Sequence, residues 1–172
     1  PGFTKVGWGM TALLHVPPER IKVVIDRETL SLGDRTLEFL LTPWTHWPET
    51  QVTYLREDRI LFSCDLFGSH IAASDLFMQD ERATYLSAKR YYAEIMMPFR
   101  GSIRGHLEKV KALPLAMIAP SHGPIYRNPA FILDAYADWT SDAVKNEVVI
   151  PYISMHGSTL KMVEQLTEAL MA

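Results

Sequence analysis

The stretch RILFSCDLFGSH, residues 59–70, runs from an apolar segment into a carboxylate, a glycine turn and a histidine. The apolar segment 60–64 predicts a buried strand, and Asp65 follows it directly. A charge at the end of a core strand is costly unless another group neutralises it. A salt bridge, a cap or a metal ion could do this, and the rest of the sequence has to distinguish among them.

Composition limits the class of protein. The 172 residues are 48% hydrophobic and 22% charged, which predicts one domain or slightly more with a substantial core. The net charge of −3 argues against a nucleic-acid partner bound through a basic surface. No apolar run approaches the roughly 20 residues of a membrane span, so we expect no membrane association. The single cysteine, Cys64, excludes an internal disulfide and is typical of a cytoplasmic protein.

Short apolar runs and turn residues alternate through the first part of the chain. The pair Gly33-Asp34 and the charged loop 56–59 each separate two such runs, so each predicts a β-hairpin. We expect strands or extended segments over residues 21–25, 29–32, 36–41, 51–55, 60–64 and 115–119.

Helical spacing of apolar residues begins after Asp80. One amphipathic pattern continues to Pro98, and a second continues from there to Pro114. Asn128 and Pro129 are typical of the first residues of a third helix. Strands followed by helices in this order predict an α/β chain, organised as an α+β sandwich.

The last residues resemble the start of a new domain. Residues 141–147, SDAVKNE, are polar and typical of a linker, and the run 148–153 predicts a strand followed by a loop and a helix. One strand and one helix cannot form a core alone. We therefore expect residues 1–143 to form one domain and residues 144–172 to begin a second.

The loop SMHGST in this tail combines hydroxyl groups with a predicted helix start, which is the usual composition of an anion site. Hydroxyl-rich loops after a first strand hold the phosphate of FMN in flavodoxin-like folds. An ordinary capped helix is the alternative. The candidate residues are Ser154, Met155, His156, Gly157, Ser158 and Thr159.

Three strand-like runs lead into residues that can bind metals, namely His46, Asp65 and His122. Ligands on loops at one edge of a sheet converge easily, because neighbouring strands lie ~5 Å apart. Two imidazoles and a carboxylate suit zinc, iron or manganese, and a carboxylate can bridge two ions. Taken singly, each residue could also be a cap, a loop charge or a hydrogen-bonded histidine.

Other polar residues have weaker patterns. His70 lies five residues beyond Asp65 and could support a metal site, whereas His106 lies in a charged helix and we expect it to be solvated. Tyr91 and Tyr92 are most simply core residues, although one phenol could point at the site. Cys64 alternates with Asp65 along the strand, so we expect it to be a small core residue.

Three segments together resemble the flavodiiron proteins, also called A-type flavoproteins. The segments are LTPWTHWPETQVTYLREDRILFSCDLFGSH at 41–70, MIAPSHGPIYRNP at 117–129 and VVIPYISMHGSTLKM at 148–162. They are similar to the family's HWP segment, its strand ending in Asp with a following FG, its SHG segment and the start of its flavodoxin domain. The resemblance implies part of a metallo-β-lactamase-like αββα domain, followed by the first β-loop-α unit of a flavodoxin-like domain.

The resemblance also implies roles. His46 and His122 would each bind one of two non-haem irons, Asp65 would bridge them, and Tyr92 would stand beside the site. Residues 154–159 would bind the FMN phosphate. The family reduces O2 to water, NO to N2O, or both, as a head-to-tail homodimer that receives electrons from rubredoxin-like donors or a reduced deazaflavin.

One departure limits this reading. The family's HxExDH ligand cluster, which precedes the HWP segment, does not occur in this sequence. We therefore expect the chain to be a fragment with an incomplete diiron site. The alternatives are a zinc-dependent hydrolase of the metallo-β-lactamase class and a non-catalytic domain used for binding or assembly.

Overall fold

The computed structural model describes residues 11–143 and 146–172. The chain divides into two compact units, Pro1–Ser141 and Asp142–Ala172. The described elements of the first unit are η1 (Pro18–Arg20), β1 (Thr29–Ser31), β2 (Thr36–Leu41), β3 (Gln51–Leu55), β4 (Ile60–Cys64), α2 (Glu81–Tyr91), η2 (Tyr92–Met96), η3 (Met97–Phe99), α3 (Arg100–Lys111), β5 (Met117–Pro120) and α4 (Pro129–Thr140). The second unit contains α5 (Ser158–Met171).

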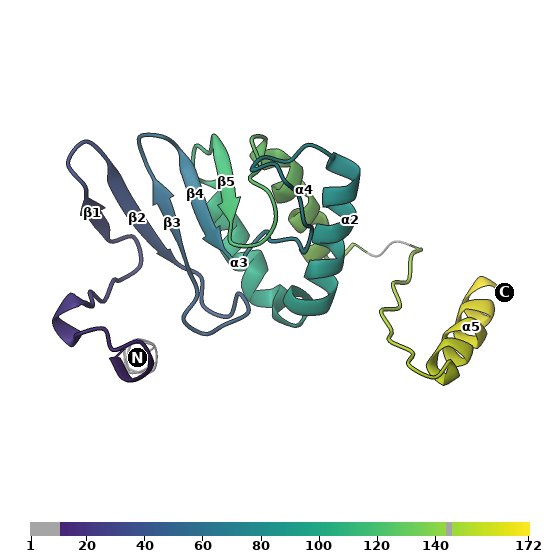
Figure 1. The fold of residues 1–172 in the computed structure, drawn as a ribbon. Coiled ribbons are helices and arrows are strands. Elements are labelled where there is room, and N and C mark those ends of the chain that lie inside the picture. The colour runs from purple at the N-terminus through teal and green to yellow at the C-terminus, as the bar shows by residue number, and fades with distance from the viewer. Residues whose placement is uncertain (1–10, 144–145) are drawn as a thin grey trace. The chain divides into compact units, whose positions relative to one another are not determined.

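The five strands form one mixed sheet in the order β1-β2-β3-β4-β5 (Figure 1). Strands β1 to β4 pair antiparallel, each with the next. The two predicted hairpins, β1–β2 and β3–β4, are thereby confirmed. Gly33 has a φ of +99° in the first of these turns, a conformation that glycine adopts without strain. Strand β5 pairs parallel to β4.

These pairings decide where the chain leaves the sheet. Because β2 and β4 are both antiparallel to β3, they run in the same direction, and β5 runs with them. The carboxyl ends of β2, β4 and β5 therefore lie at one edge of the sheet. The loops that follow these three strands contain the three residues predicted to bind metal.

The core lies on one face of the sheet. Leu40, Val52, Leu61 and Ile118 alternate with more exposed residues along their strands and are fully buried. They belong to one apolar cluster with residues of α2, α3 and α4, which are grouped together in Figure 1. Phe62, on the opposite face, is 45% exposed. A mixed sheet with helices packed on one face agrees with the predicted α+β sandwich and with part of an αββα domain.

The predicted helices form, with one refinement. The carboxylate of Asp80 accepts a hydrogen bond from Ala83 N–H (2.9 Å) and caps α2. Pro98 does not separate α2 from α3 by a loop. Instead a π-helical turn, η2, and a 3-10 turn, η3, join the two helices, which places Pro98 where its missing N–H costs little.

Two apolar runs, 21–25 and 148–153, lie in the described part of the chain, and neither forms a strand. Pairing with β2 begins only at residues 27 and 28, where Arg27 N–H donates to Phe39 O and Phe39 N–H donates to Glu28 O. The β-loop-α unit expected in the tail is therefore only a loop and a helix. A strand requires a hydrogen-bonded neighbour, and Pro151 interrupts the run with a residue that has no N–H.

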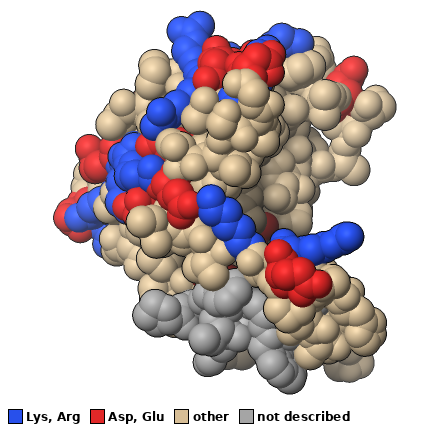
Figure 2. Space-filling view, turned by 90° about the vertical axis from the view of Figure 1, so that its left-hand side faces the viewer, with Lys and Arg blue, Asp and Glu red and all other residues tan. Residues whose placement is uncertain are grey.

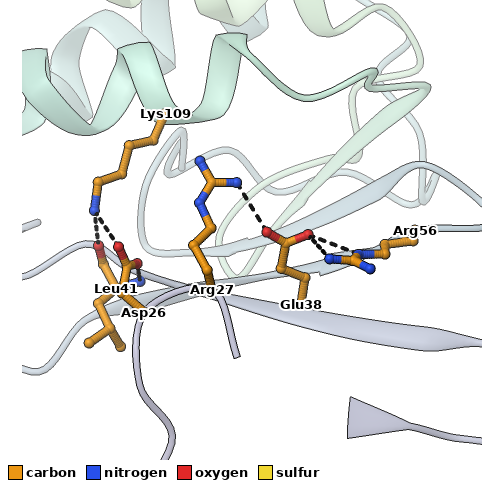
Figure 3. A network of polar contacts seen from close by, with 6 residues as sticks. All are labelled: Asp26, Arg27, Glu38, Leu41, Arg56 and Lys109. Carbon is orange, nitrogen blue, oxygen red and sulfur yellow. Dashed lines mark hydrogen bonds and ion pairs between the residues drawn. The ribbon is translucent and has the colours of Figure 1, made fainter. Parts of the chain in front are cut away.

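The surface charges are mixed rather than separated. In the view of Figure 2, Lys and Arg lie beside Asp and Glu. One pair of interactions is partly buried: Glu38, on β2, accepts hydrogen bonds from Arg27 and from Arg56 (Figure 3). Among the described helices, none has the length and hydropathy needed to cross a lipid bilayer.

Candidate metal centre

His46, Asp65 and His122 meet at the edge where β2, β4 and β5 end. Asp65 lies between the two histidines. Its Oδ2 is 3.1 Å from His46 Nε2, and its Oδ1 is 3.2 Å from His122 Nε2. The three side chains are 25%, 21% and 45% exposed, in chain order, so the cluster borders on solvent. Residues far apart in sequence are thus neighbours, as the strand-end pattern predicts.

Two main-chain hydrogen bonds hold the Asp65 and His122 loops together. Ser121 N–H donates to Cys64 O (2.8 Å), and Ser69 N–H donates to His122 O (3.0 Å). Gly123 has a φ of +83°, and a Cβ at this position would lie 2.8 Å from the carbonyl oxygen of Ser69. Only glycine allows the two loops to approach so closely.

A closed loop carries His46. Thr45, which is fully buried, donates both its N–H (3.3 Å) and its hydroxyl (2.8 Å) to Thr42 O. Trp44 N–H donates to Trp47 O (2.8 Å), and the Thr50 hydroxyl donates to Thr45 O and to Trp47 O (both 2.9 Å). These bonds leave the backbone on both sides of His46 little freedom.

The spacing of the donor atoms fits metal binding. Two ligand atoms that each lie ~2.1 Å from one ion, at angles of roughly 90 to 110°, are about 3.0 to 3.4 Å apart. The observed contacts of 3.1 and 3.2 Å fall in this range. Each imidazole faces a different oxygen of Asp65, which is the arrangement of a carboxylate shared between two ions. The same distances also fit two plain histidine–aspartate hydrogen bonds.

These three residues do not complete a metal site. Within residues 11–143 and 146–172, no group of three or more His, Cys, Asp or Glu side chains is arranged to hold a metal ion. The two imidazoles contact different oxygens of Asp65. An ion at either position therefore needs further ligands to reach the four or more that transition metals require.

Tyr91, and not Tyr92, lies beside this cluster. The Tyr91 ring is 6.0 Å from the His122 ring and 4.8 Å from the His70 ring. The hydroxyl of Tyr92 instead donates to Trp139 O (3.1 Å), in α4. The structure therefore places Tyr91 beside the cluster and directs the Tyr92 hydroxyl to α4, while the predicted role of Tyr92 stays a prediction. Because consecutive residues of a helix point about 100° apart, only one of two adjacent tyrosines can face the sheet edge.

The environment of Tyr91 keeps its phenol protonated. Burial raises the pKa of Tyr91, and the nearby charge of Asp65 raises it further. The side chain is only 2% exposed, and it packs against Gly68, where a Cβ would lie 3.1 Å from the tyrosine ring. Tyr91 is therefore a buried hydrogen-bond donor rather than a base.

Two other residues at this edge differ from expectation or extend it. Cys64 is exposed rather than part of the core, because it alternates with the buried Leu61 and Ser63 along β4 and shares the exposed face with Phe62. Although the residue as a whole is exposed, partial burial of its thiol raises the pKa of Cys64, and the charge of Asp65 raises it further. His70 is exposed, and its ring packs edge-on against the rings of His122 (5.4 Å) and Tyr91.

The six residues 154–159 precede and begin α5. The Ser154 hydroxyl accepts a hydrogen bond from Leu160 N–H (3.1 Å), and Gly157 adopts a φ of +78° just before the helix. Met155 and His156 are exposed, and Thr159 is half-buried. The loop thus has the N–H groups and hydroxyls of an anion site, but the predicted strand before it is absent.

The sheet, its helical layer and the histidines and aspartate at its strand ends define a metallo-β-lactamase-like domain. The sequence model of the ODP family beta lactamase matches residues 8–123. The chain belongs to this family.

Its relatives are longer proteins. The chain is 39% identical over 170 residues to coenzyme F420H(2) oxidase of Methanothermobacter marburgensis, covering 93% of this chain and 42% of that protein. It is 41% identical over 149 residues to nitric oxide reductase of Moorella thermoacetica, covering 84% of this chain and 37% of the relative. The chain therefore spans about two fifths of the length of the relatives that it matches.

Solved structures agree. Rubredoxin oxygen:oxidoreductase of Desulfovibrio gigas superposes with a TM-score of 0.78 at 34% identity, covering 94% of this chain and 42% of that one. Flavodiiron proteins of other organisms are also among the structures that it matches. The resemblance to flavodiiron proteins is thereby confirmed.

Proposed function

We propose that the protein containing this chain is a flavodiiron oxidoreductase that reduces O2 to water, NO to N2O, or both. The observation that supports this most is the position of Asp65, whose two carboxylate oxygens each face a different histidine. In this proposal His46 and His122 would each bind one of two irons, and Asp65 would supply the carboxylate shared between them. The iron pair, when bound, supplies the electrons and open coordination positions that the small oxidant needs.

The protein residues then have distinct tasks. The carboxylate of Asp65 supplies negative charge at a strand end where cations neutralise it. Each histidine would offer the lone pair of its Nε2 to a metal ion. Tyr91 would pack its ring beside the imidazole of His122 and against Gly68, which restrains that side of the cluster.

The second unit is proposed to begin the flavin domain, with the boundary between residues 1–143 and 144–172. Ser154, Ser158, Thr159 and the first N–H groups of α5 would hold the FMN phosphate, because helix N-termini favour anions.

The remaining parts of the proposal concern partners. A reduced deazaflavin or a rubredoxin-like donor is supported by the names of the relatives from M. marburgensis and D. gigas. A head-to-tail homodimer would bring the FMN of one subunit near the irons of the other. A cytoplasmic location is consistent with the unpaired Cys64.

Metal analysis and turnover test the central proposal. The full-length protein should contain iron and FMN. When it is prepared anaerobically and supplied with reduced FMN, it should consume added O2 or NO. Asp65→Ala should lower iron content at least about tenfold and abolish turnover, whereas Asp134→Ala, which removes an exposed carboxylate on α4, should change neither. Wild-type activity in Asp65→Ala would contradict the bridging role of Asp65. Zinc without flavin would favour a hydrolase.

Flavin selectivity tests the loop separately. FMN and riboflavin differ only in the phosphate, so the wild type should bind FMN more tightly. In the double variant Ser154→Ala with Thr159→Val, the ratio of the riboflavin and FMN dissociation constants should fall about tenfold. The reason is that two hydroxyl hydrogen bonds to an anion are lost. Thr167→Val, which removes a hydroxyl bonded within α5 to Val163 O, is the control. Unchanged selectivity in the double variant would contradict the phosphate site.

A further inference from the structure

Helix α3 holds the main chain just before the His46 loop at two points. Lys109 reaches from the helix to Leu41 O (3.3 Å) and to Asp26 (3.1 Å), as Figure 3 shows. One turn earlier, His106 Nε2 lies 2.9 Å from Pro43 O. Residues three apart share one face of a helix, so both side chains meet the segment that leaves β2.

The contact between His106 and Pro43 defines which nitrogen of the imidazole donates. A carbonyl oxygen only accepts hydrogen bonds, so Nε2 must carry the hydrogen in this contact. Nδ1 is buried and has no partner among the described residues. His106 is thus a hydrogen-bond donor to the main chain before the His46 loop, and not the solvated histidine that its charged helix predicts.

The Pro43 carbonyl is closely coupled to His46. Only Trp44 and Thr45 separate the two residues. Trp44 adopts a φ of +64°, a conformation that is uncommon for residues other than glycine, and its ring stacks on Phe99 of η3 at 6.5 Å. Thr45 is bonded back to Thr42 O by its N–H and its hydroxyl. A shift of Pro43 therefore cannot be absorbed within the loop and must move His46.

We propose that His106 is a positioning residue for His46. Its Nε2–H holds the Pro43 carbonyl, which sets the loop, and the loop places the His46 imidazole against Asp65. The effect on the loop stands on the hydrogen bonds alone, whereas the consequence for metal binding rests on the proposed function. The two parts are therefore tested separately.

The first test uses metal-free protein. Amide hydrogen exchange at Trp44 and Thr45, whose N–H groups close the loop, should be about five- to tenfold faster in His106→Leu than in wild type. His106→Gln keeps a side-chain N–H near the position of Nε2 and should restore slow exchange. His15→Leu, at an exposed histidine, is the control. Unchanged exchange in His106→Leu would overturn the proposal.

The second test measures metal binding by the full-length protein, with Co²⁺ as a coloured probe. His106→Leu should bind Co²⁺ about tenfold more weakly and shift its visible absorption band, because an outer hydrogen bond that orients a ligand has been lost. His106→Gln should stay within about threefold of wild type. Equal losses in both variants, or no loss in His106→Leu, would overturn the positioning role.

Two further outcomes are an unfolded His106→Leu variant and a wild type that binds no metal. If His106→Leu does not fold, His106→Asn replaces it, because its shorter amide stays polar but does not reach Pro43 O, and it should behave as described for leucine. If the wild type binds no metal at all, the proposed diiron function fails, while the exchange test in metal-free protein still decides whether His106 holds the loop.

Discussion

Strand β4, residues 60–64, and the run 148–153 are both short apolar segments followed by a loop that contains glycine and serine. Strand β4 pairs with β3 on one side and with β5 on the other, and Leu61 is fully buried. The run 148–153 forms no strand, and Ile153 is 85% exposed. The difference shows that an apolar run becomes a strand only where other strands satisfy its N–H and C=O groups.

A helix, unlike a strand, can form without a neighbouring element. Helix α5 forms although none of its residues is buried, because its hydrogen bonds lie within the helix itself. Its apolar residues Met162, Leu166 and Leu170 are exposed. The first unit is therefore held by tertiary contacts, whereas the second shows what local interactions alone produce. Four predictions test this distinction.

The largest expected effect is in the core. Leu61→Ala should reduce the free energy of unfolding by about 2 to 5 kcal/mol, since it leaves a cavity between the sheet and its helices. The matched change Ile153→Ala should alter it by less than about 0.5 kcal/mol. Urea unfolding followed by tryptophan fluorescence measures both, because all four tryptophans precede residue 142. A large effect of Ile153→Ala would contradict the conclusion that the run 148–153 does not contribute to the core.

Two glycines with positive φ provide the next contrast. Gly123→Ala should cost about 3 kcal/mol, because the left-handed backbone is strained and the new Cβ meets the Ser69 carbonyl. Gly157→Ala has a similar φ but no atom within 4 Å of the new Cβ, so only about 1 kcal/mol of local strain is expected. Unfolding midpoints and far-ultraviolet circular dichroism distinguish the two. Equal effects would mean that loop contact at Gly123 is unimportant.

The pH dependence of the first unit follows from Glu38. Burial raises the pKa of Glu38, but hydrogen bonds and charges from Arg27 and Arg56 outweigh it, so the pKa lies below its ordinary value. The stabilisation is complete above the unfolded pKa of about 4.3 and is lost as pH falls through the lower folded pKa. Glu38→Gln should lower the free energy of unfolding by about 1 kcal/mol at pH 7, and it should make the remaining free energy less dependent on pH.

The measurement for Glu38 is tryptophan-monitored urea unfolding between pH 7 and pH 3, in wild type and in Glu38→Gln. Asp34→Asn, at an exposed carboxylate paired with Arg35, is a suitable control and should leave most of the slope. A wild-type slope that survives in Glu38→Gln would assign the acid sensitivity to other carboxylates.

The smallest contrast concerns helix starts. Asp80→Ala removes the bond to Ala83 N–H and should lower the stability of the first unit by about 1 kcal/mol. Ser154→Ala removes the bond to Leu160 N–H and should speed hydrogen exchange at Leu160 by about fivefold, with no change in the fluorescence transition. A shifted transition in Ser154→Ala would show that α5 contributes to the stability of the first unit.

The fold was predictable from the sequence where a local pattern is compatible with only one local structure. Gly33 in its turn, Asn128 and Pro129 at the start of α4, and the apolar periods on either side of Pro98 each agree with the structure. The runs 21–25 and 148–153 were wrongly expected to be strands, because the pattern of a strand does not reveal its neighbour. The joining of α2 to α3 through π and 3-10 turns has no signal in the sequence that we can identify.

The site was predictable in its ligands but not in its support. His46, Asp65 and His122 stand out because each follows a strand, and the structure brings them together. Their binding of metal stays a prediction. Tyr91 could not be distinguished from Tyr92 without the helix rotation. His106 could not be distinguished from a solvated histidine, since its partner is a main-chain carbonyl 63 residues away.

The sequence by itself determined the local elements and the chemical groups at their ends, because turns, caps and periodicity depend on neighbouring residues. Only the tertiary structure decided which of those groups meet. The common direction of β2, β4 and β5 gathers their carboxyl ends, and helix α3 brings His106 to Pro43. Asp65, an isolated charge after β4 in the sequence, thereby gains two histidine partners from the loops that follow β2 and β5, since packing joins residues that the chain keeps far apart.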